Sequence, residues 1–487
     1  MLQRTVHRHK TPVEKVQRRP RWIVVGIFLF IAFGYAVIPP AGPRVRDVAI
    51  AEDELRAKIA TLSLPPISEF RESYAAIDDK TRLKAKLGRL VFESTWLSRD
   101  GKMSCATCHS NPSDVTAVAP SAKPLFNLRW QTWFGPDGES DNLHAAVLRA
   151  IENPNELDSS RAVVAAAART LWSKEYHAVF GDLPTALPPV ELLVGMGGPE
   201  QPQLRLDATV AATGLASIGS PSLLDDIIEY ALRDHIAPAA ELARRALSLP
   251  STSHSWQHKY SQLSTTEAAA VNKVFVNVGL ALSTYLEGFV ATDAPFDRFA
   301  GRLSEGKSVT DALGEGFSNS ELQGLKLFLG PAKCVSCHDG RTMSDQNFHN
   351  LGLSQHGEHL EAGRAVAILR ATTDPFGCLQ TLSNGNNIVG DCSKTITLNP
   401  QNTTALGAFR TPSLRQLASK SGYMHDHRFQ KLEDVLSYLN DPRDIPAIGK
   451  RDPQIEALDL TKEELAAIRS FLGSLNGRIT NVYAELK

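Results

Sequence analysis

The sequence carries almost no net charge, since 52 Lys and Arg residues are matched by 53 Asp and Glu residues along 487 positions. Without a basic excess, a nucleic-acid partner is not expected. Alternation of apolar and polar residues with period two is scarce, which argues against a fold dominated by sheet. Cysteines are also few, six in all, and four of them fall into two copies of one short motif.

The two motifs, Cys105–His109 and Cys334–His338, both read Cys-x-x-Cys-His. In covalent haem attachment the two thiols add to the haem vinyl groups and the adjoining histidine reaches the iron, so all three residues must be close in sequence. A redox dithiol or half of a zinc site is the alternative, but neither needs a histidine directly after the second cysteine. The motifs predict two covalently bound haem c groups held by Cys105, Cys108, His109, Cys334, Cys337 and His338, with the two histidines as iron ligands.

The N-terminus combines a basic head with an apolar run. Residues 1–21 hold seven Lys or Arg against the single acid Glu14, and the uncharged segment Trp22–Ile38 follows. Its 17 residues are at the lower limit for a transmembrane helix, and the positive-inside rule exports everything after it. A cleaved signal peptide is the alternative, although the small-x-small pattern Ala49–Ala51 stands well downstream. We expect periplasmic domains anchored in the inner membrane, or a soluble periplasmic protein after cleavage.

The remaining two cysteines, Cys378 and Cys392, lie outside the motifs. In an oxidising compartment they could pair and close a loop rich in Asn and Thr. Two unrelated buried thiols are the alternative.

The chain is longer than the size at which one hydrophobic core keeps growing, so at least two folded units are expected. Apolar residues at helical spacing predict a mainly α fold. The long helices are expected over Lys80–Phe92, Arg161–Phe180, Leu223–Leu247, Thr265–Val290 and Asn319–Leu329.

Composition and motif positions divide the chain into six parts. The basic tail at 1–21 and the anchor or signal segment at 22–38 are followed by a tether at 39–78, which is expected to contain a short helical piece. An N-terminal haem domain is expected at 79–300 with an insertion at about 183–264, and a C-terminal haem domain at 301–475 with a loop at about 370–406. Residues 476–487 form a tail.

Short strings around the motifs run in a fixed order from about residue 80 to 475. They are Leu87–Phe92, Leu97–Gly101, Glu152–Glu156, Pro295–Phe299, Phe348–Gly352, Phe409–Arg415 and Tyr423–Asp426. In this order the chain resembles the bacterial dihaem cytochrome c peroxidases and the related dihaem enzymes of methylamine utilisation. The resemblance implies a mainly α fold with two cytochrome c-like domains that face each other. It does not cover the insertion, the loop at about 370–406 or the N-terminal segment, whose apolar run adds one expected transmembrane helix before these domains.

At the first haem, the resemblance makes Glu156 the distal carboxylate that takes and returns a proton. Sequence alone would make it an acid at the start of a helix. Trp133 matches the residue that relays electrons between the haems, and core packing is the alternative. The family usually has Asp-Gly directly after this tryptophan, whereas here the pair comes later, at Asp137-Gly138. No histidine occurs from Ser110 to Leu143, so we expect an iron that is open at rest; His144 is expected to be an ordinary surface or core residue.

At the second haem, the resemblance places a methionine or a tyrosine opposite the proximal histidine. The aligned residue is Leu439, Tyr438 is one place off register, and Met424 is the nearest methionine. A thioether favours reduced iron and a phenolate favours oxidised iron. Met424 is the preferred iron ligand and Tyr438 stays open, while His425 is expected to support the site and His427 replaces the usual glycine.

Family members also hold a calcium ion between the domains. The aligned residues here are Ser121 and Lys420. An ammonium group beside a bound cation is unfavourable, so the sequence gives calcium no support.

The resemblance implies a peroxidase that reduces hydrogen peroxide to water with electrons from a small donor protein, a cytochrome c or a cupredoxin. A methylamine-utilisation-type enzyme that oxidises a protein or organic substrate is one alternative. A dihaem electron carrier is another, and the histidine-free loop argues against it. Further expected partners are the membrane, through the anchor, and a second copy of the chain in a homodimer.

Overall fold

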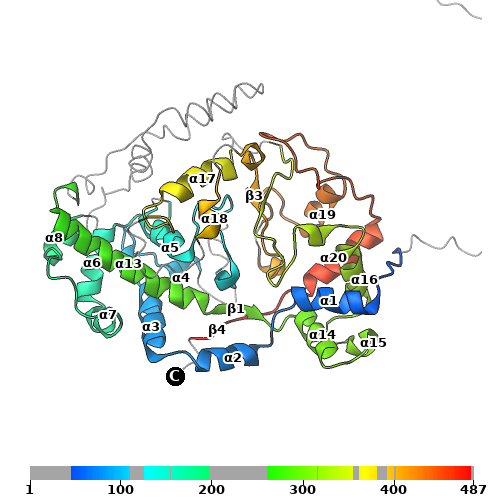
Figure 1. The fold of residues 1–487 in the computed structure, drawn as a ribbon, viewed down its shortest axis with the longest axis horizontal. Helices are drawn as coiled ribbons and strands as arrows, with labels where there is room; N and C mark the ends of the chain where they lie inside the picture. Colours follow the sequence, from blue (N-terminus) through cyan, green and yellow to red (C-terminus); the bar gives the residue numbers. More distant parts are fainter. Residues whose placement is uncertain are drawn as a thin grey trace, which may run out of the picture. The chain divides into compact units, whose positions relative to one another are not determined.

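The computed structural model describes residues 45–109, 125–153, 155–196, 260–314, 316–354, 361–380, 392–399, 402–420 and 422–483. The predicted anchor at 22–38 and the predicted helix Leu223–Leu247 lie outside these ranges, as does most of the insertion at 183–264. Within them the chain is mainly helical, as predicted, with two short antiparallel sheets (Figure 1).

One set of elements surrounds a hydrophobic core that we call the N-terminal core. These elements are α3 (Asp79–Glu93), α4 (Cys105–Cys108), α5 (Leu143–Glu152), α6 (Arg161–Thr170), α7 (Ser173–Phe180), α8 (Val190–Val194), α13 (Thr265–Glu287) and β1 (Phe289–Thr292). The long helix α13 packs against α3, α5 and α6. It is the one helix among the described residues that is long and apolar enough to cross a membrane, but 72% of its apolar window is buried inside the protein. It is therefore a core helix.

The remaining elements surround a second core, the C-terminal core, or lie beside it. The main helices are α14 (Pro295–Ser304), α15 (Val309–Ala312), α16 (Asn319–Leu329), α19 (Leu432–Asn440) and α20 (Lys462–Gly473), with strands β2 (Phe348–His349) and β3 (Phe409–Arg410). Two helices from this half of the chain, α17 (Arg364–Thr373) and α18 (Ser393–Ile396), lie beside α5 instead (Figure 1). Thr395 of α18 donates to Asp141, and Phe376, just after α17, is buried in the N-terminal core. Short 3-10 turns complete both parts, at Thr95–Leu97, Leu128–Trp130, Cys334–Ser336, Thr403–Ala405 and Leu417–Ser419.

Local sequence signals explain where the main helices begin. Ser264 and Glu267 form a capping box at the start of α13, and Ser318 and Glu321 do the same for α16. The predicted helix Asn319–Leu329 is confirmed with both ends correct. The predicted helix Arg161–Phe180 is instead two helices, α6 and α7, because the chain turns at Leu171 to bury Trp172.

Two segments outside the predicted haem domains contain regular secondary structure. The predicted tether at 39–78 contains α1 (Glu52–Leu62) and α2 (Ile67–Ala75), and Leu55, Ile59 and Leu62 of α1 are buried in the C-terminal core. The predicted tail at 476–487 contributes β4 (Arg478–Asn481), which pairs antiparallel with β1. Both segments are short and weakly patterned, so only their packing partners make them structured.

A buried ion pair ties three distant segments together. Arg415 donates two hydrogen bonds of 3.0 Å to the carboxylate of Asp297 and a third, of 2.8 Å, to the carbonyl of Leu62. Asp297 also accepts from the backbone N–H of Leu64 at 2.9 Å. The strings Pro295–Phe299 and Phe409–Arg415, noted separately in the sequence, therefore meet in space.

Glycine allows the same close helix contact in both cores. A Cβ on Gly88 of α3 would lie 2.0 Å from the carbonyl oxygen of Ala281 in α13. A Cβ on Gly324 of α16 would lie 2.0 Å from the carbonyl oxygen of Ala467 in α20. Such a distance requires the backbones to separate if any side chain is introduced.

Replacing Gly324 by alanine should therefore lower the free energy of unfolding by about 1–3 kcal/mol through overpacking. The matched control is Gly301→Ala in α14, where an added Cβ meets no heavy atom within 4 Å. That change should stabilise the helix by up to about 1 kcal/mol. Denaturant titration of the haem-loaded protein, followed by circular dichroism, measures both values; equal effects of the two substitutions would contradict the close contact.

Candidate functional site: a cavity shared by two haem motifs

One cavity of about 1390 Å³ is lined by both Cys-x-x-Cys-His motifs. Its volume exceeds the roughly 300–1,000 Å³ of a typical small-molecule pocket, which suits more than one large ligand. The six motif residues on its wall are Cys105, Cys108, His109, Cys334, Cys337 and His338. The structure therefore brings together residues that the sequence separates widely.

The first motif is positioned by a short capped helix. Ser104 and Thr107 form a capping box around α4, which carries Cys105 and Cys108. Burial raises the pKa of the Cys105 thiol to about 12, and the charge of Glu156 adds to this. Burial also lowers the pKa of His109 to about 4. At neutral pH the imidazole of His109 is therefore uncharged, the form that binds a metal.

The second motif follows α16 and is positioned differently. The Nδ1 atom of His338 lies 2.9 Å from the carbonyl oxygen of Met343. Since a carbonyl only accepts, the proton is on Nδ1, and Nε2 is left as the atom for iron. Burial lowers the pKa of His338 to about 4, so this ring is also neutral. Burial first, and Cys337 second, raise the pKa of Cys334 to about 12.

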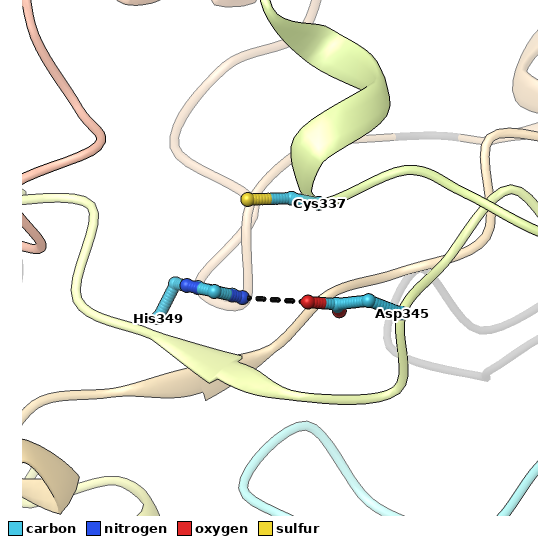
Figure 2. A group of neighbouring side chains, drawn as sticks. All are labelled: Cys337, Asp345 and His349. Atoms are coloured by element: carbon cyan, nitrogen blue, oxygen red, sulfur yellow. Dashed lines mark hydrogen bonds and ion pairs between the residues drawn. The ribbon is translucent and has the colours of Figure 1, made fainter.

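A zinc site fits these residues poorly. Within the described ranges, the one group of Cys, His, Asp and Glu side chains close enough to share a metal is Cys337, Asp345 and His349 (Figure 2). It contains a single cysteine of the motif, whereas structural zinc sites take four Cys or His ligands. The four free motif thiols and the two neutral histidines around a large cavity fit haem c instead.

His349 is also occupied by other partners. Its Nε2 lies 3.0 Å from Asp345 and its Nδ1 lies 2.7 Å from Asp452. Hydrogen bonding to Asp345 first, and then to the Cys337 thiol, raises the pKa of His349 to about 11. With both nitrogens protonated the ring has no lone pair for a metal. The sequence string Phe348–Gly352 contained this residue but did not reveal its ion pairs.

Glu156 lies in the cavity wall just beyond α5. Its Oε1 accepts a hydrogen bond of 2.7 Å from the side chain of Asn153. The side chain is exposed to the cavity, yet nearby protein atoms desolvate the carboxyl and raise its pKa, while Asn153 opposes the shift. Glu156 and Cys105 are close enough for the carboxylate to affect the thiol. The predicted distal acid thus stands beside the first motif.

A group of charged residues extends this part of the wall. Arg149 lies 2.6 Å from Glu139 and 3.8 Å from Asp374, and Arg370 lies 3.2 Å from Glu139. Burial raises the pKa of Asp374 to about 6. Sequence reasoning missed these residues because the acids and bases come from three separate segments.

Trp133 is 5% exposed and lies behind the cavity surface, while its neighbours Gln131 and Phe134 line it. Its ring packs edge-on against Phe348 of β2, with centroids 6.1 Å apart. The candidate relay therefore lies where the loop after the first motif meets the C-terminal part. His144, expected to be an ordinary residue, is buried in α5.

Met424, Leu439 and His425 line the cavity, whereas Tyr438 is not among the lining residues. The hydroxyl of Tyr438 donates a hydrogen bond of 3.0 Å to the carbonyl of Leu351. Met424 has a φ of +68°, a conformation uncommon outside glycine that marks a constrained turn.

The positions of three further residues named from the sequence are as follows. His427, which replaces the usual glycine, also has a positive φ, +57°, in the region that favours glycine. Lys420 lines the cavity, and its charge contributes to the low pKa of His338. Ser121 lies outside the described residues.

Haem attachment is tested by removing one thiol pair at a time. Replacing Cys105 and Cys108 together by serine should leave one covalent haem per chain, and so should replacing Cys334 and Cys337. Intact-mass measurement of the denatured protein counts attached haems, with wild-type protein expected to carry two. A wild-type chain that loses its haem on denaturation would contradict covalent attachment.

The sixth ligand of the second iron is tested with two neighbouring substitutions. Since a thioether ligand raises the potential of haem iron, Met424→Leu should lower the midpoint potential of one haem. Tyr438→Phe should leave both potentials unchanged, because the Tyr438 hydroxyl is bonded to a carbonyl behind the cavity wall. Spectroelectrochemical titration gives both values, and the opposite pattern would assign Tyr438 instead.

A family model described as di-haem cytochrome c peroxidase matches residues 82–193. The methylamine utilization protein MauG of Methylorubrum extorquens is 23% identical over 92% of this chain and 93% of that protein. The cytochrome-c peroxidase IdrP1 of Denitromonas iodatirespirans is 32% identical over 38% of this chain and 45% of that protein. The crystal structure of the diheme peroxidase BthA of Burkholderia thailandensis matches 81% of this chain and 86% of its own chain, at 16% identity and a TM-score of 0.46. At these values the similarity rests on the sequence matches. They confirm the resemblance predicted from the sequence: this chain is a relative of the di-haem cytochrome c peroxidases and of the methylamine-utilisation protein MauG.

Proposed function

We propose that this chain is a dihaem peroxidase that reduces hydrogen peroxide to water with electrons from a small redox protein, a cytochrome c or a cupredoxin. The observation that carries the proposal is the shared cavity: both haem motifs and the carboxyl group of Glu156 lie on its wall. A family model for di-haem peroxidases covers the segment that contains the first motif and Glu156.

The motif residues would hold the haems. The thiols of Cys105, Cys108, Cys334 and Cys337 are free to form the covalent links, and His109 and His338 offer neutral imidazoles to the irons. When bound, haem supplies an iron that binds peroxide and a means to accept and pass on electrons. The four cysteines and two histidines fix where these groups sit.

Glu156 would move the protons. Asn153 holds Oε1 through its side-chain N–H, and Oε2 accepts no hydrogen bond within the described residues. Oε2 can take a proton from the near oxygen of peroxide and return it to the departing oxygen, so that the leaving group is water rather than hydroxide. Desolvation brings the pKa of this carboxyl closer to neutral pH. A group whose pKa lies nearer to the working pH can both accept a proton and return it.

The two haem sites would have different functions, peroxide binding at the first motif and electron entry at the second. The first, beside Glu156 and followed by a loop without histidine, suits the iron that meets peroxide. The second would receive electrons from the donor protein and deliver them past Trp133. Met424, in the cavity wall, would complete its ligand set.

A second candidate function is oxidation of a protein or organic substrate, as in methylamine utilisation. The supporting observation is the match to MauG over 93% of that protein's length, against 45% for the peroxidase IdrP1. Turnover distinguishes the two: rapid peroxide-dependent oxidation of reduced cytochrome c supports the peroxidase. Two haems without such turnover, or without a high-spin signal, would rule it out.

We also propose export and membrane anchoring through residues 1–38. The disulfide between Cys378 and Cys392 supports export, because such bonds persist in oxidising compartments. A full-length chain that stays with membranes after an alkaline wash would support the anchor. A soluble protein with its N-terminus near Glu52 would show signal cleavage instead.

Replacing Glu156 by glutamine should reduce kcat/KM for peroxide by about 10²–10⁴-fold, because the amide keeps the shape but cannot exchange a proton. Glu93→Gln is the matched control, since Glu93 lies on the exposed side of α3 and pairs with Arg89. The control should keep wild-type activity. Full activity in Glu156→Gln would remove this carboxyl from the mechanism.

The pH profile gives an independent check. Desolvation by nearby protein atoms raises the pKa of Glu156 above its ordinary value near 4.5, and only the ionised carboxylate can accept the proton of peroxide. We therefore expect kcat/KM for peroxide to rise with pH through this raised pKa and to level off above it. The same measurement on Glu156→Gln should show no such limb.

A further inference from the structure

Arg364, the first residue of α17, is 4% exposed and lies between two aromatic rings. Its guanidinium carbon is 3.9 Å from the ring centroid of Trp133 and 4.0 Å from that of Phe348. Trp133 comes from the loop after the first motif and Phe348 from β2. A cation therefore lies on the face of the candidate relay.

In the described part of the chain, no carboxylate lies at ion-pair distance from this cation. Among the described residues Arg364 forms no ion pair, and its side chain donates to the carbonyls of Gly138 at 2.5 Å and Asp137 at 3.4 Å. The equally buried Arg415, in contrast, is paired with an aspartate. Burial lowers the pKa of Arg364 to about 10, while Asp137 and Asp141 oppose the shift, so the guanidinium is still charged at neutral pH.

The surrounding backbone is shaped to admit this arrangement. Gly138 has a φ of +73°, and a Cβ there would lie 2.3 Å from the Phe348 ring and 2.6 Å from Nη1 of Arg364. A larger residue would displace the guanidinium from Trp133. Asp137 and Gly138, which the sequence separates from Trp133, therefore contact the arginine that packs on the Trp133 ring.

A cation on the face of an indole ring is attracted by the π electrons. Loss of one electron from Trp133 to a one-electron oxidant, such as photogenerated ruthenium(III) tris-bipyridine, would leave an indole radical cation and the reduced oxidant. The attraction would then become repulsion between two positive charges in a poorly solvated site. Arg364 therefore makes loss of an electron from Trp133 less favourable.

We propose that Arg364 is a positioning residue that keeps Trp133 closed-shell, so that electrons cross between the two haem sites through the indole without residing there as a radical. The crossing itself rests on the proposed peroxidase function. The protection of the indole by Arg364 does not, and it can be measured separately.

The experiment uses the haem-loaded full chain and an external oxidant, photogenerated ruthenium(III) tris-bipyridine, in place of peroxide. Transient absorption and freeze-trapped electron paramagnetic resonance record indole radicals. Arg364→Gln should increase the radical yield by an order of magnitude or more, because it removes the charge and keeps an amide that can donate to Gly138. The added Trp133→Phe substitution should abolish that increase.

Two controls make the result specific. Arg364→Lys keeps the charge and should stay near the wild-type yield. Arg129→Gln removes a cation 5.6 Å from the ring of Trp130, outside the cavity wall, and should also leave the yield unchanged. Equal yields in wild type and Arg364→Gln, with matching haem spectra, would overturn the proposal.

If Arg364→Gln does not fold, comparing the radical yields of wild type and Trp133→Phe still tests the proposal. Wild type and Trp133→Phe should then give the same radical yield, since Trp133 is protected in the wild type. A clear loss of radical on removing Trp133 from the otherwise native chain would overturn the proposal. Peroxidase turnover enters none of these readouts, so failure of the proposed function would be seen separately.

Discussion

The close contact between two pairs of helices determines where the chemistry of this protein can take place. In each core a glycine, Gly88 or Gly324, lets a helix approach the backbone of its partner so closely that no side chain fits between them. The helix that carries this glycine leads in both cores to a Cys-x-x-Cys-His motif. Sliding of either helix pair would bring a side chain into the close contact, and separation would leave a void in a packed core, so the motifs have well-defined starting points beside the shared cavity.

Charge is distributed around the cavity in two ways. Toward Glu156, acids and bases alternate, as in the pairs of Arg149 and Arg370 with Glu139, so that the carboxyl lies among charges that are largely compensated. Toward Trp133, the close partners of a buried arginine within the described ranges are carbonyls and ring faces. The first arrangement suits proton transfer and the second opposes removal of an electron from the indole. The proposed division of labour between the two ends of the cavity follows from these different surroundings.

Helices with clear signals were predictable from the sequence, and α16 has both predicted ends because its capping box and apolar spacing are local. The break between α6 and α7, the bounds and packing of α1 within the tether, and the strand β4 were not predicted, because each depends on burial against residues far away in the sequence. At the site, the motif residues and Glu156 were named from local strings. The ion pair of His349 with Asp452 joins segments more than one hundred residues apart, and the stacking of Arg364 on Trp133 joins segments more than two hundred apart, so no local pattern encodes them.

The sequence by itself determined the covalent chemistry: four thiols and two histidines at fixed spacing, because haem attachment needs neighbouring residues. It also determined the helical character of the chain, since apolar spacing is local. Only the tertiary structure decided that both motifs and Glu156 share one cavity and that Tyr438 is bonded behind its wall while Met424 lies on it. It likewise decided that a cation covers the indole of Trp133. The physical reason is that burial and electrostatics act between groups that are neighbours in space, and the path of the chain makes them so.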